Sequence, residues 1–278
     1  MYMKLRTVYI LIFSAIFLIV CLVMISSFSD IAQLVSRDID AADAPLIIVD
    51  AGHGGEDGGA EVEGVLEKDI NLSIARKTAD ILRLSGYRVK EVRTEDISVY
   101  SDDSETLREK KVSDLNNRVR MFNEDADAVA VSIHQNKYDN SKYHGAQLFY
   151  STNDPDSADL ARAIRTSVVM LLQNDNTREL KPAGKDIFIL KNAEVPAVIV
   201  ECGFLSNAEE RQKLTDETYQ QEIAYAIAMG VIDYQNQKNS KYRNTLWLRS
   251  KAYISARSAD MKARNGTGNA PRAASGTP

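Results

Sequence analysis

The segment LIIVDAGHGGEDGGA, residues 46–60, carries the pattern that decides the fold. Its first five residues, Leu46–Asp50, form a short apolar run of the kind found in the buried middle of an α/β sheet. The loop that follows has five glycines among residues 52–59, so its backbone can take positive φ and approach a ligand closely. A phosphate-binding P-loop is disfavoured because no Gly-Lys-Ser/Thr sequence follows. We expect a buried strand that ends in a functional loop, with a simple flexible turn as the alternative.

Strand-like and helix-like patterns alternate on both sides of this loop, through residues 45–236. The strand-like runs, rich in Val and Ile, are Leu46–Asp50, Tyr87–Val92, Val129–His134, Ala146–Ser151, Ile187–Leu190 and Ala197–Glu201. The segments with helical spacing are Lys68–Ser85, Ser113–Glu124, Ser157–Gln173 and Glu217–Gln235. Such alternation predicts an α/β fold whose sheet has helices on both faces.

Composition bounds the class of protein. The 278 residues are 44% hydrophobic and 26% charged, which is typical of a globular chain. Two cysteines, Cys21 and Cys202, are too few for a disulfide framework. The net charge of −5 argues against nucleic acid as a partner. Residues 237–278 carry nine Lys/Arg and one acid, so an acidic body precedes a basic tail.

The N-terminal segment predicts export. Between Arg6 and Asp30 lie 23 residues without a charge, long enough for a transmembrane helix and longer than a usual signal-peptide core. Lys4 and Arg6 precede the run, so the N-terminus is expected in the cytoplasm and the rest outside, anchored in the cytoplasmic membrane. Cleavage and release, or a buried core helix, are the alternatives. The predicted parts are an anchor over 1–29, a tether over 30–44, a folded domain over 45–236 and a disordered tail over 237–278.

Three of the predicted strands end on residues that can bind metal or move protons. Leu46–Asp50 runs into His53, Val129–His134 ends on His134, and Ala197–Glu201 ends on Glu201. In open α/β sheets, ligand sites lie outside the carboxyl ends of the strands. If these strands are parallel neighbours, the three side chains meet at one edge of the sheet.

Glu67 is a candidate third metal ligand. A catalytic zinc site takes three protein ligands from His and carboxylate and keeps one open position, which His53, Glu67 and His134 would provide. The spacings of 14 and 67 residues match no compact helical zinc motif, so spacing alone is unspecific. A solvated carboxylate in the first turn of a helix is the alternative for Glu67.

Four segments together resemble the motifs of a known family. They are similar, in order, to the motifs of the zinc-dependent N-acetylmuramoyl-L-alanine amidases of type 3. The four segments are VDAGHGGEDGGA, LEKDINL, ADAVAVSIHQN and VPAVIVECGFLSN. The resemblance covers residues 45–235 and implies one α/β catalytic domain with a mixed, mostly parallel sheet of about six strands. It also implies Zn²⁺ on His53, Glu67 and His134, with Glu201 as general acid/base. The implied reaction is hydrolysis of the amide between N-acetylmuramic acid and L-alanine in peptidoglycan by a zinc-activated water.

Within that family the chain looks most like the short sporulation and germination-specific members, because it has an N-terminal anchor, no wall-binding repeats and no long insertion between His134 and Glu201. This implies action on spore cortex. The sequence predicts no obligate protein partner. Two alternatives stay open: a non-catalytic wall-binding or regulatory module on the same fold, and another zinc hydrolase of peptidoglycan, such as a peptidase or deacetylase.

Other polar residues have weaker candidate roles. His144 is expected in a loop near the cleft, touching substrate, although the matching family position is not a ligand. Asn136 and Asn207 are candidates to orient the site or the glycan, with turn capping as the alternative. Arg118 matches a recurrent family arginine and is expected to be structural, and Cys202 is expected to be a packed thiol on the opposite side of its strand.

Overall fold

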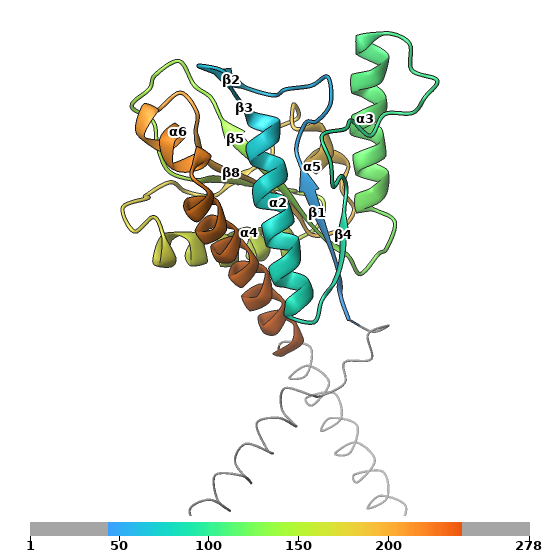
Figure 1. The fold of residues 1–278 in the computed structure, drawn as a ribbon. Coiled ribbons are helices and arrows are strands. Elements are labelled where there is room, and N and C mark those ends of the chain that lie inside the picture. The colour runs from blue at the N-terminus through green and yellow to red at the C-terminus, as the bar shows by residue number, and fades with distance from the viewer. Residues whose placement is uncertain (1–43, 241–278) are drawn as a thin grey trace, which may run out of the picture. The chain divides into compact units, whose positions relative to one another are not determined.

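The computed structural model describes residues 44–240, which fold around one six-stranded sheet (Figure 1). Its strands are β1 (Leu46–Ala51), β4 (Arg88–Glu91), β5 (Val129–Asn136), β6 (Gln147–Tyr150), β7 (Lys181–Pro182) and β8 (Ala197–Phe204). The order across the sheet is β4-β1-β5-β8-β6-β7. All neighbours are parallel except β6 and β8, which are antiparallel. The predicted mixed, mostly parallel sheet is therefore confirmed.

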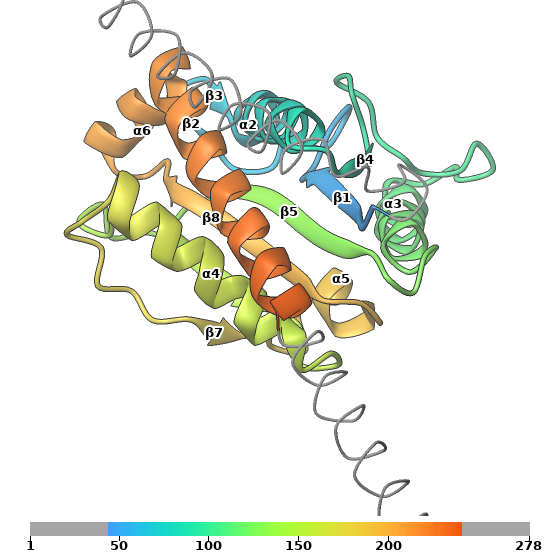
Figure 2. The same ribbon diagram turned by 90° about the horizontal axis from the view of Figure 1, so that it is seen from below.

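Helices cover both faces of the sheet (Figure 2). One face packs against α2 (Glu67–Leu84), α4 (Asp156–Leu171), α6 (Ala208–Thr215) and a helix over residues 217–240. The other packs against α3 (Leu107–Phe122) and α5 (Phe188–Asn192). Along β1, Ile47 and Val49 join the first hydrophobic cluster while Leu46 and Ile48 join the second. Because both faces are buried, the strand is apolar from Leu46 to Val49 instead of alternating, and its one charged residue, Asp50, is paired with Arg118.

The prediction of a strand at Ile187–Leu190 is wrong. The structure forms the short helix α5 there, with Ile189 and Leu190 buried. A brief apolar run has no period long enough to separate a buried helical turn from a strand. The sixth strand is β7, whose two residues pair with Phe149 and Tyr150 and are too few to leave a sequence pattern.

The helix expected at Ser113–Glu124 begins six residues earlier, at Leu107. Thr106 caps it, because its side chain accepts from the Glu109 amide and the Glu109 carboxylate accepts from the Thr106 amide. The first turns carry charged, exposed side chains, so an apolar stripe marks only the later part of the helix.

A small hairpin leads into α2. Strands β2 (Glu61–Val62) and β3 (Val65–Leu66) pair antiparallel through Glu63 and Gly64, whose φ angles are 52° and 79°. Two successive positive φ angles are those of a type I′ turn, which matches the twist of paired strands. The hairpin delivers the chain to Glu67, the first residue of α2.

The predicted anchor over residues 1–29, the tether apart from Ala44, and the tail beyond residue 240 lie outside the described residues. Among the helices of residues 44–240, none is both long and apolar enough to cross a bilayer. The anchor and the export that follows from it stay predictions.

Candidate metal and catalytic site

Three side chains from separate elements meet at the carboxyl edge of the sheet. His53 follows β1, Glu67 opens α2 and His134 lies near the end of β5, and one ligand atom from each falls within 4.8 Å of the others. Glu67 Oε2 is 3.2 Å from His53 Nε2, and Glu67 Oε1 is 2.9 Å from His134 Nδ1. The two imidazole rings meet edge to face with their centroids 5.0 Å apart. This donor set of two imidazoles and one carboxylate fits a divalent ion such as zinc.

The carboxylate of Glu67 is fixed from several directions. Its Oε2 accepts from the Ala60 amide at 2.8 Å, and its Oε1 accepts from the Gln135 amide at 3.0 Å and from Asn71 Nδ2 at 3.2 Å. Burial raises the pKa of Glu67, but hydrogen bonds to the two histidines outweigh it and hold the pKa well below its usual range. The side chain is therefore ionised and pre-aligned as a ligand.

His53 is held in an uncommon backbone conformation, with φ of 62° in the left-handed region. Its Nδ1 lies 2.9 Å from Asp57 Oδ2, which leaves Nε2 to face Glu67. A carboxylate on the far nitrogen fixes the orientation of a metal-binding imidazole. The local sequence around His53 thus supplies both a candidate ligand and the group that aims it.

Glu201 lies beside this cluster without joining it. It pairs in register with His134 across β5 and β8, so both side chains project from the same face of the sheet. Its Oε2 is buried and has no hydrogen-bond partner in the described part of the chain. Burial and the nearby Glu67 raise the pKa of Glu201 to about 7, although the two histidines partly offset them. A carboxyl whose pKa is raised toward neutrality is suited to taking and returning a proton.

Two buried arginines hold the loop that carries His53 through hydrogen bonds to its backbone carbonyls. Arg118 pairs with Asp50 and donates to the carbonyl of Ala51 at 3.0 Å and to that of His53 at 2.7 Å. Arg93 donates to the carbonyls of Ala51 at 2.8 Å and Gly52 at 3.0 Å. No hydrogen bond or ion pair joins either guanidinium to Glu201 within the described residues.

A model of one enzyme family matches residues 47–233, and its description is N-acetylmuramoyl-L-alanine amidase. The match spans the whole sheet and the four motifs that predicted it. The chain belongs to the N-acetylmuramoyl-L-alanine amidase family. The resemblance inferred from the sequence is thereby confirmed.

Individual members of the amidase family agree with this. The germination-specific N-acetylmuramoyl-L-alanine amidase of Bacillus subtilis is 32% identical over 193 residues, which cover 69% of this chain and 81% of that protein. The CwlD amidase of Clostridioides difficile, solved in complex with the GerS lipoprotein, is 42% identical with a TM-score of 0.66, covering 69% of this chain and 98% of that one. An N-acetylmuramoyl-L-alanine amidase of Clostridium difficile 630 is 30% identical with a TM-score of 0.60, and the match covers 70% of this chain and 98% of that one.

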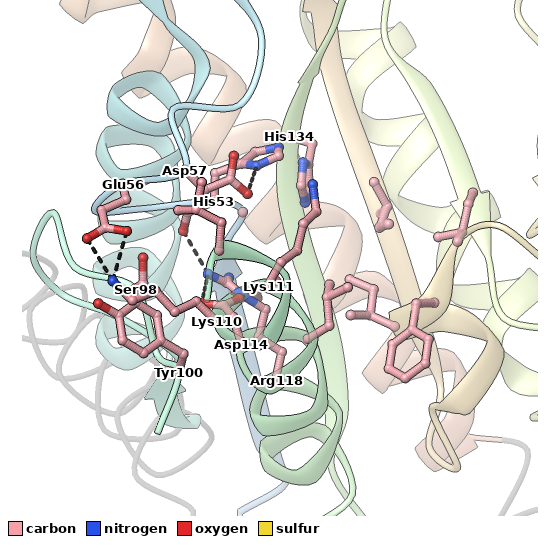
Figure 3. A pocket seen from close by; sticks show the side chains of 18 of the residues that line it. His53, Glu56, Asp57, Ser98, Tyr100, Lys110, Lys111, Asp114, Arg118 and His134 are labelled. Atoms are coloured by element: carbon pink, nitrogen blue, oxygen red, sulfur yellow. Dashed lines mark hydrogen bonds and ion pairs between the residues drawn. The ribbon is translucent and has the colours of Figure 1, made fainter. Parts of the chain in front are cut away.

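A cavity of about 480 Å³ opens beside the two histidines of this amidase-family chain. Figure 3 shows Lys110, Lys111 and Arg118, from α3, on its wall next to the loop of His53. Lys110 is paired with Glu56, at 3.0 Å. Apolar side chains of α3 and of the segment around α5 complete the wall. The cavity gives a ligand room to reach the cluster.

The weaker sequence candidates do not belong to the three-ligand cluster. His144 and Asn207 line a separate hollow near α6, where the Asn207 side chain caps that helix by accepting from the Glu210 amide. Asn136 ends β5, two residues beyond His134. Substrate contacts of these residues stay predictions. Cys202 is fully buried in the hydrophobic cluster on the face of the sheet opposite to Glu201, as expected of a packed thiol.

Sequence reasoning missed the residues that support the site. Asp57, Asn71 and Arg93 hold His53, Glu67 and the glycine loop through side-chain bonds that only the fold creates. Asp57 stands inside the GHGGEDGG loop and follows His53 by four residues, and Asn71 follows Glu67 by four residues on α2. Arg93 instead acts across the chain, on Gly52 41 positions away.

We expect Gly52→Ala to abolish metal binding while the protein stays folded. A Cβ at Gly52 would lie 2.2 Å from Cε1 and Nε2 of His134, so the imidazole would have to leave its place. Gly58→Ala is the matched control, since its Cβ would meet only the flexible Leu66 side chain, at 3.3 Å. Zinc content after dialysis, measured by mass spectrometry, checks this. Full zinc occupancy in Gly52→Ala would show that His134 is not a ligand.

The metal-free protein should lose stability as the pH rises from 6.5 to 9. Burial lowers the pKa of His53, but interactions with Asp57 and Glu67 outweigh it and raise the pKa from 6.5 to about 9. A histidine whose pKa is higher in the folded than in the unfolded protein stabilises the folded state when it is protonated. This stabilisation is complete at a pH below the unfolded-state pKa and is lost as the pH rises through the folded-state pKa. Urea unfolding of EDTA-treated protein at several pH values measures the slope. Asp57→Asn should flatten it, and an equal slope in both proteins would contradict the assignment.

Proposed function

We propose that this protein hydrolyses the amide between N-acetylmuramic acid and L-alanine in peptidoglycan, with zinc held by His53, Glu67 and His134. The observation that carries the proposal is the pairing of a three-ligand cluster with Glu201, a half-buried residue whose buried Oε2 atom has no hydrogen-bond partner in the described residues. Two imidazoles, one carboxylate and a free neighbouring acid are the donor set of catalytic zinc hydrolases.

The reaction needs a nucleophile, a stabilised carbonyl oxygen and a protonated leaving group. Zinc, when bound, supplies a Lewis acid that lowers the pKa of water and polarises a carbonyl. Glu201 accepts a proton from the attacking water as its oxygen bonds to the lactyl carbonyl carbon. The same carboxyl then gives the proton to the alanine nitrogen as the C–N bond breaks. Asp57 and Asn71 keep His53 and Glu67 aligned meanwhile.

Spore cortex is the substrate we favour, with the catalytic domain on the outer side of the cytoplasmic membrane. The germination-specific relative, of which the alignment covers 81%, supports the cortex. The N-terminal uncharged run supports the location. Since the CwlD amidase was solved in complex with a lipoprotein, a protein partner is a candidate for this chain as well, which the sequence alone did not lead us to expect.

Product masses test the proposal. Purified cortex and vegetative sacculi are digested with the full-length protein and zinc, with and without EDTA. We expect free stem peptides with an alanine amino terminus and intact glycan, released faster from cortex and abolished by EDTA. Peptides cut internally would indicate a peptidase, and loss of acetyl groups a deacetylase. No soluble product, with zinc bound, would indicate a non-catalytic module.

A further inference from the structure

An aromatic platform lies next to the site, made of Tyr138, Tyr143 and Phe204 with Arg178. Tyr138 and Tyr143 are 56% and 44% exposed and meet edge to face, with centroids 5.1 Å apart. Tyr143 stacks on the buried ring of Phe204 at 6.2 Å, and the Arg178 guanidinium lies over both of these rings, at 5.4 and 4.5 Å. Scattered exposed aromatics need no explanation, but these two touch each other and rest on a buried support.

The platform continues the face of the sheet that carries Glu201. On β5, His134 and Asn136 are two residues apart and so project from the same face. Their partners on β8 are Glu201 and Phe204, because a bulge inserts an extra residue there. Phe204 therefore shares the face of the proposed catalytic carboxyl. Tyr138 follows His134 by four residues, so its backbone lies within about 14 Å of that of His134.

The loop that bears the tyrosines is tied down. The Tyr138 amide donates to Ser206 Oγ at 3.1 Å, and Asn207 Nδ2 donates to the Ser141 carbonyl at 2.9 Å. Arg178 Nε donates to the His144 carbonyl at 2.7 Å. The rings are thus presented with little conformational entropy left to lose on binding.

The chemistry of the surface favours a sugar. Neither phenol hydroxyl of Tyr138 or Tyr143 makes a hydrogen bond within residues 44–240, so each ring offers an apolar face beside a free polar group. In the sequence, Asn136, Lys137 and Asn140 adjoin Tyr138 with polar side chains. The surface area of two phenol rings is far smaller than the roughly 1,200 Å² that a stable protein interface buries. Pyranose rings have apolar C–H faces and a hydroxyl rim, which match such a patch.

We propose that Tyr138 and Tyr143 form a glycan-binding subsite that holds the sugar chain adjoining the scissile muramoyl unit. This inference rests on the proposed amidase function, which brings a polymer of pyranose rings to Glu201. The glycan crosses the ends of β5 and β8 toward α6. The stem peptide then occupies the cavity between α3 and α5.

The test measures binding of a peptide-free tetrasaccharide of alternating N-acetylglucosamine and N-acetylmuramic acid to full-length, EDTA-treated protein by NMR titration. We expect Tyr138→Ala to weaken binding about three- to tenfold, the size of one aromatic contact. Tyr138→Phe should restore it, since the ring is kept. Tyr225→Ala is the control, a 48% exposed tyrosine on the helix of residues 217–240.

Kinetics add a second readout with the zinc-loaded protein. Tyr138→Ala should raise KM for peptidoglycan strands at unchanged kcat, and leave KM for a single muramoyl-tripeptide unaltered. No tetrasaccharide binding by the wild type, or equal binding and KM in Tyr138→Ala, would overturn the subsite even if amide hydrolysis is observed. Tyr138-dependent binding without any hydrolysis would uphold the subsite and refute the amidase function instead.

Discussion

Glu201→Gln should retain zinc and lose turnover, with kcat lowered about 10²- to 10⁴-fold, the usual contribution of a general acid/base. The amide keeps the shape of the side chain but cannot accept the water's proton. The Oε2 atom of Glu201 is buried and has no hydrogen-bond partner in the described residues, and the pKa of the carboxyl is raised to about 7. The substitution therefore breaks no described hydrogen bond of Oε2. Release of stem peptide amino groups from peptidoglycan measures kcat, and zinc content is determined on the same sample.

The matched control is Glu194→Gln, at an exposed position just before β8. It should leave kcat and zinc unchanged. Wild-type turnover in Glu201→Gln would refute the proton transfer that we assign to this residue. Loss of zinc together with turnover would instead identify Glu201 as a ligand.

Arg118→Met should destabilise the protein by about 3–5 kcal/mol, the usual cost of removing one partner from a buried ion pair. The Arg118 side chain is 3% exposed and that of Asp50 is fully buried, so the substitution leaves the Asp50 charge without its cation. It also frees the carbonyls of Ala51 and His53. The free energy of unfolding from urea titration of the zinc-free protein checks this.

Arg120→Met, two residues further along α3 and exposed, is the control and should change stability by less than about 0.5 kcal/mol. Equal stabilities of the two variants would mean that the buried pair contributes nothing to the loop. Any loss of activity in Arg118→Met should parallel the loss of stability, because Arg118 holds the backbone of His53 and takes no part in the reaction itself.

The fold was predictable where burial leaves a pattern in the sequence. β1, β5 and β8 are buried on both faces, so they stand out as apolar runs, and their ends correctly place His53, His134 and Glu201 at one edge. α5 and β7 were not predictable, since five and two residues are too short to show a period.

The site was predictable only in its outline. Strand ends indicated two imidazoles and a carboxyl. The donor set of a zinc site made Glu67 a candidate ligand, but an acid in a first helical turn has a common structural explanation, and the family resemblance was needed to favour the ligand role. Arg93 carries no signal, because only folding brings it near the carbonyls that it binds. Asn71 lies four residues after Glu67 on one helix, but this spacing is too common to mark a supporting residue, and its bond to the Gly52 carbonyl depends on the fold. The bulge that turns Phe204 to the face of Glu201 is likewise a property of strand pairing.

Anomalous diffraction at the zinc edge from crystals of the zinc-loaded protein locates the ion itself. We expect one ion bound by His53, Glu67 and His134, with Glu201 close by but outside the coordination sphere. An ion held by other residues, or zinc bonded to Glu201 in place of Glu67, would contradict this expectation.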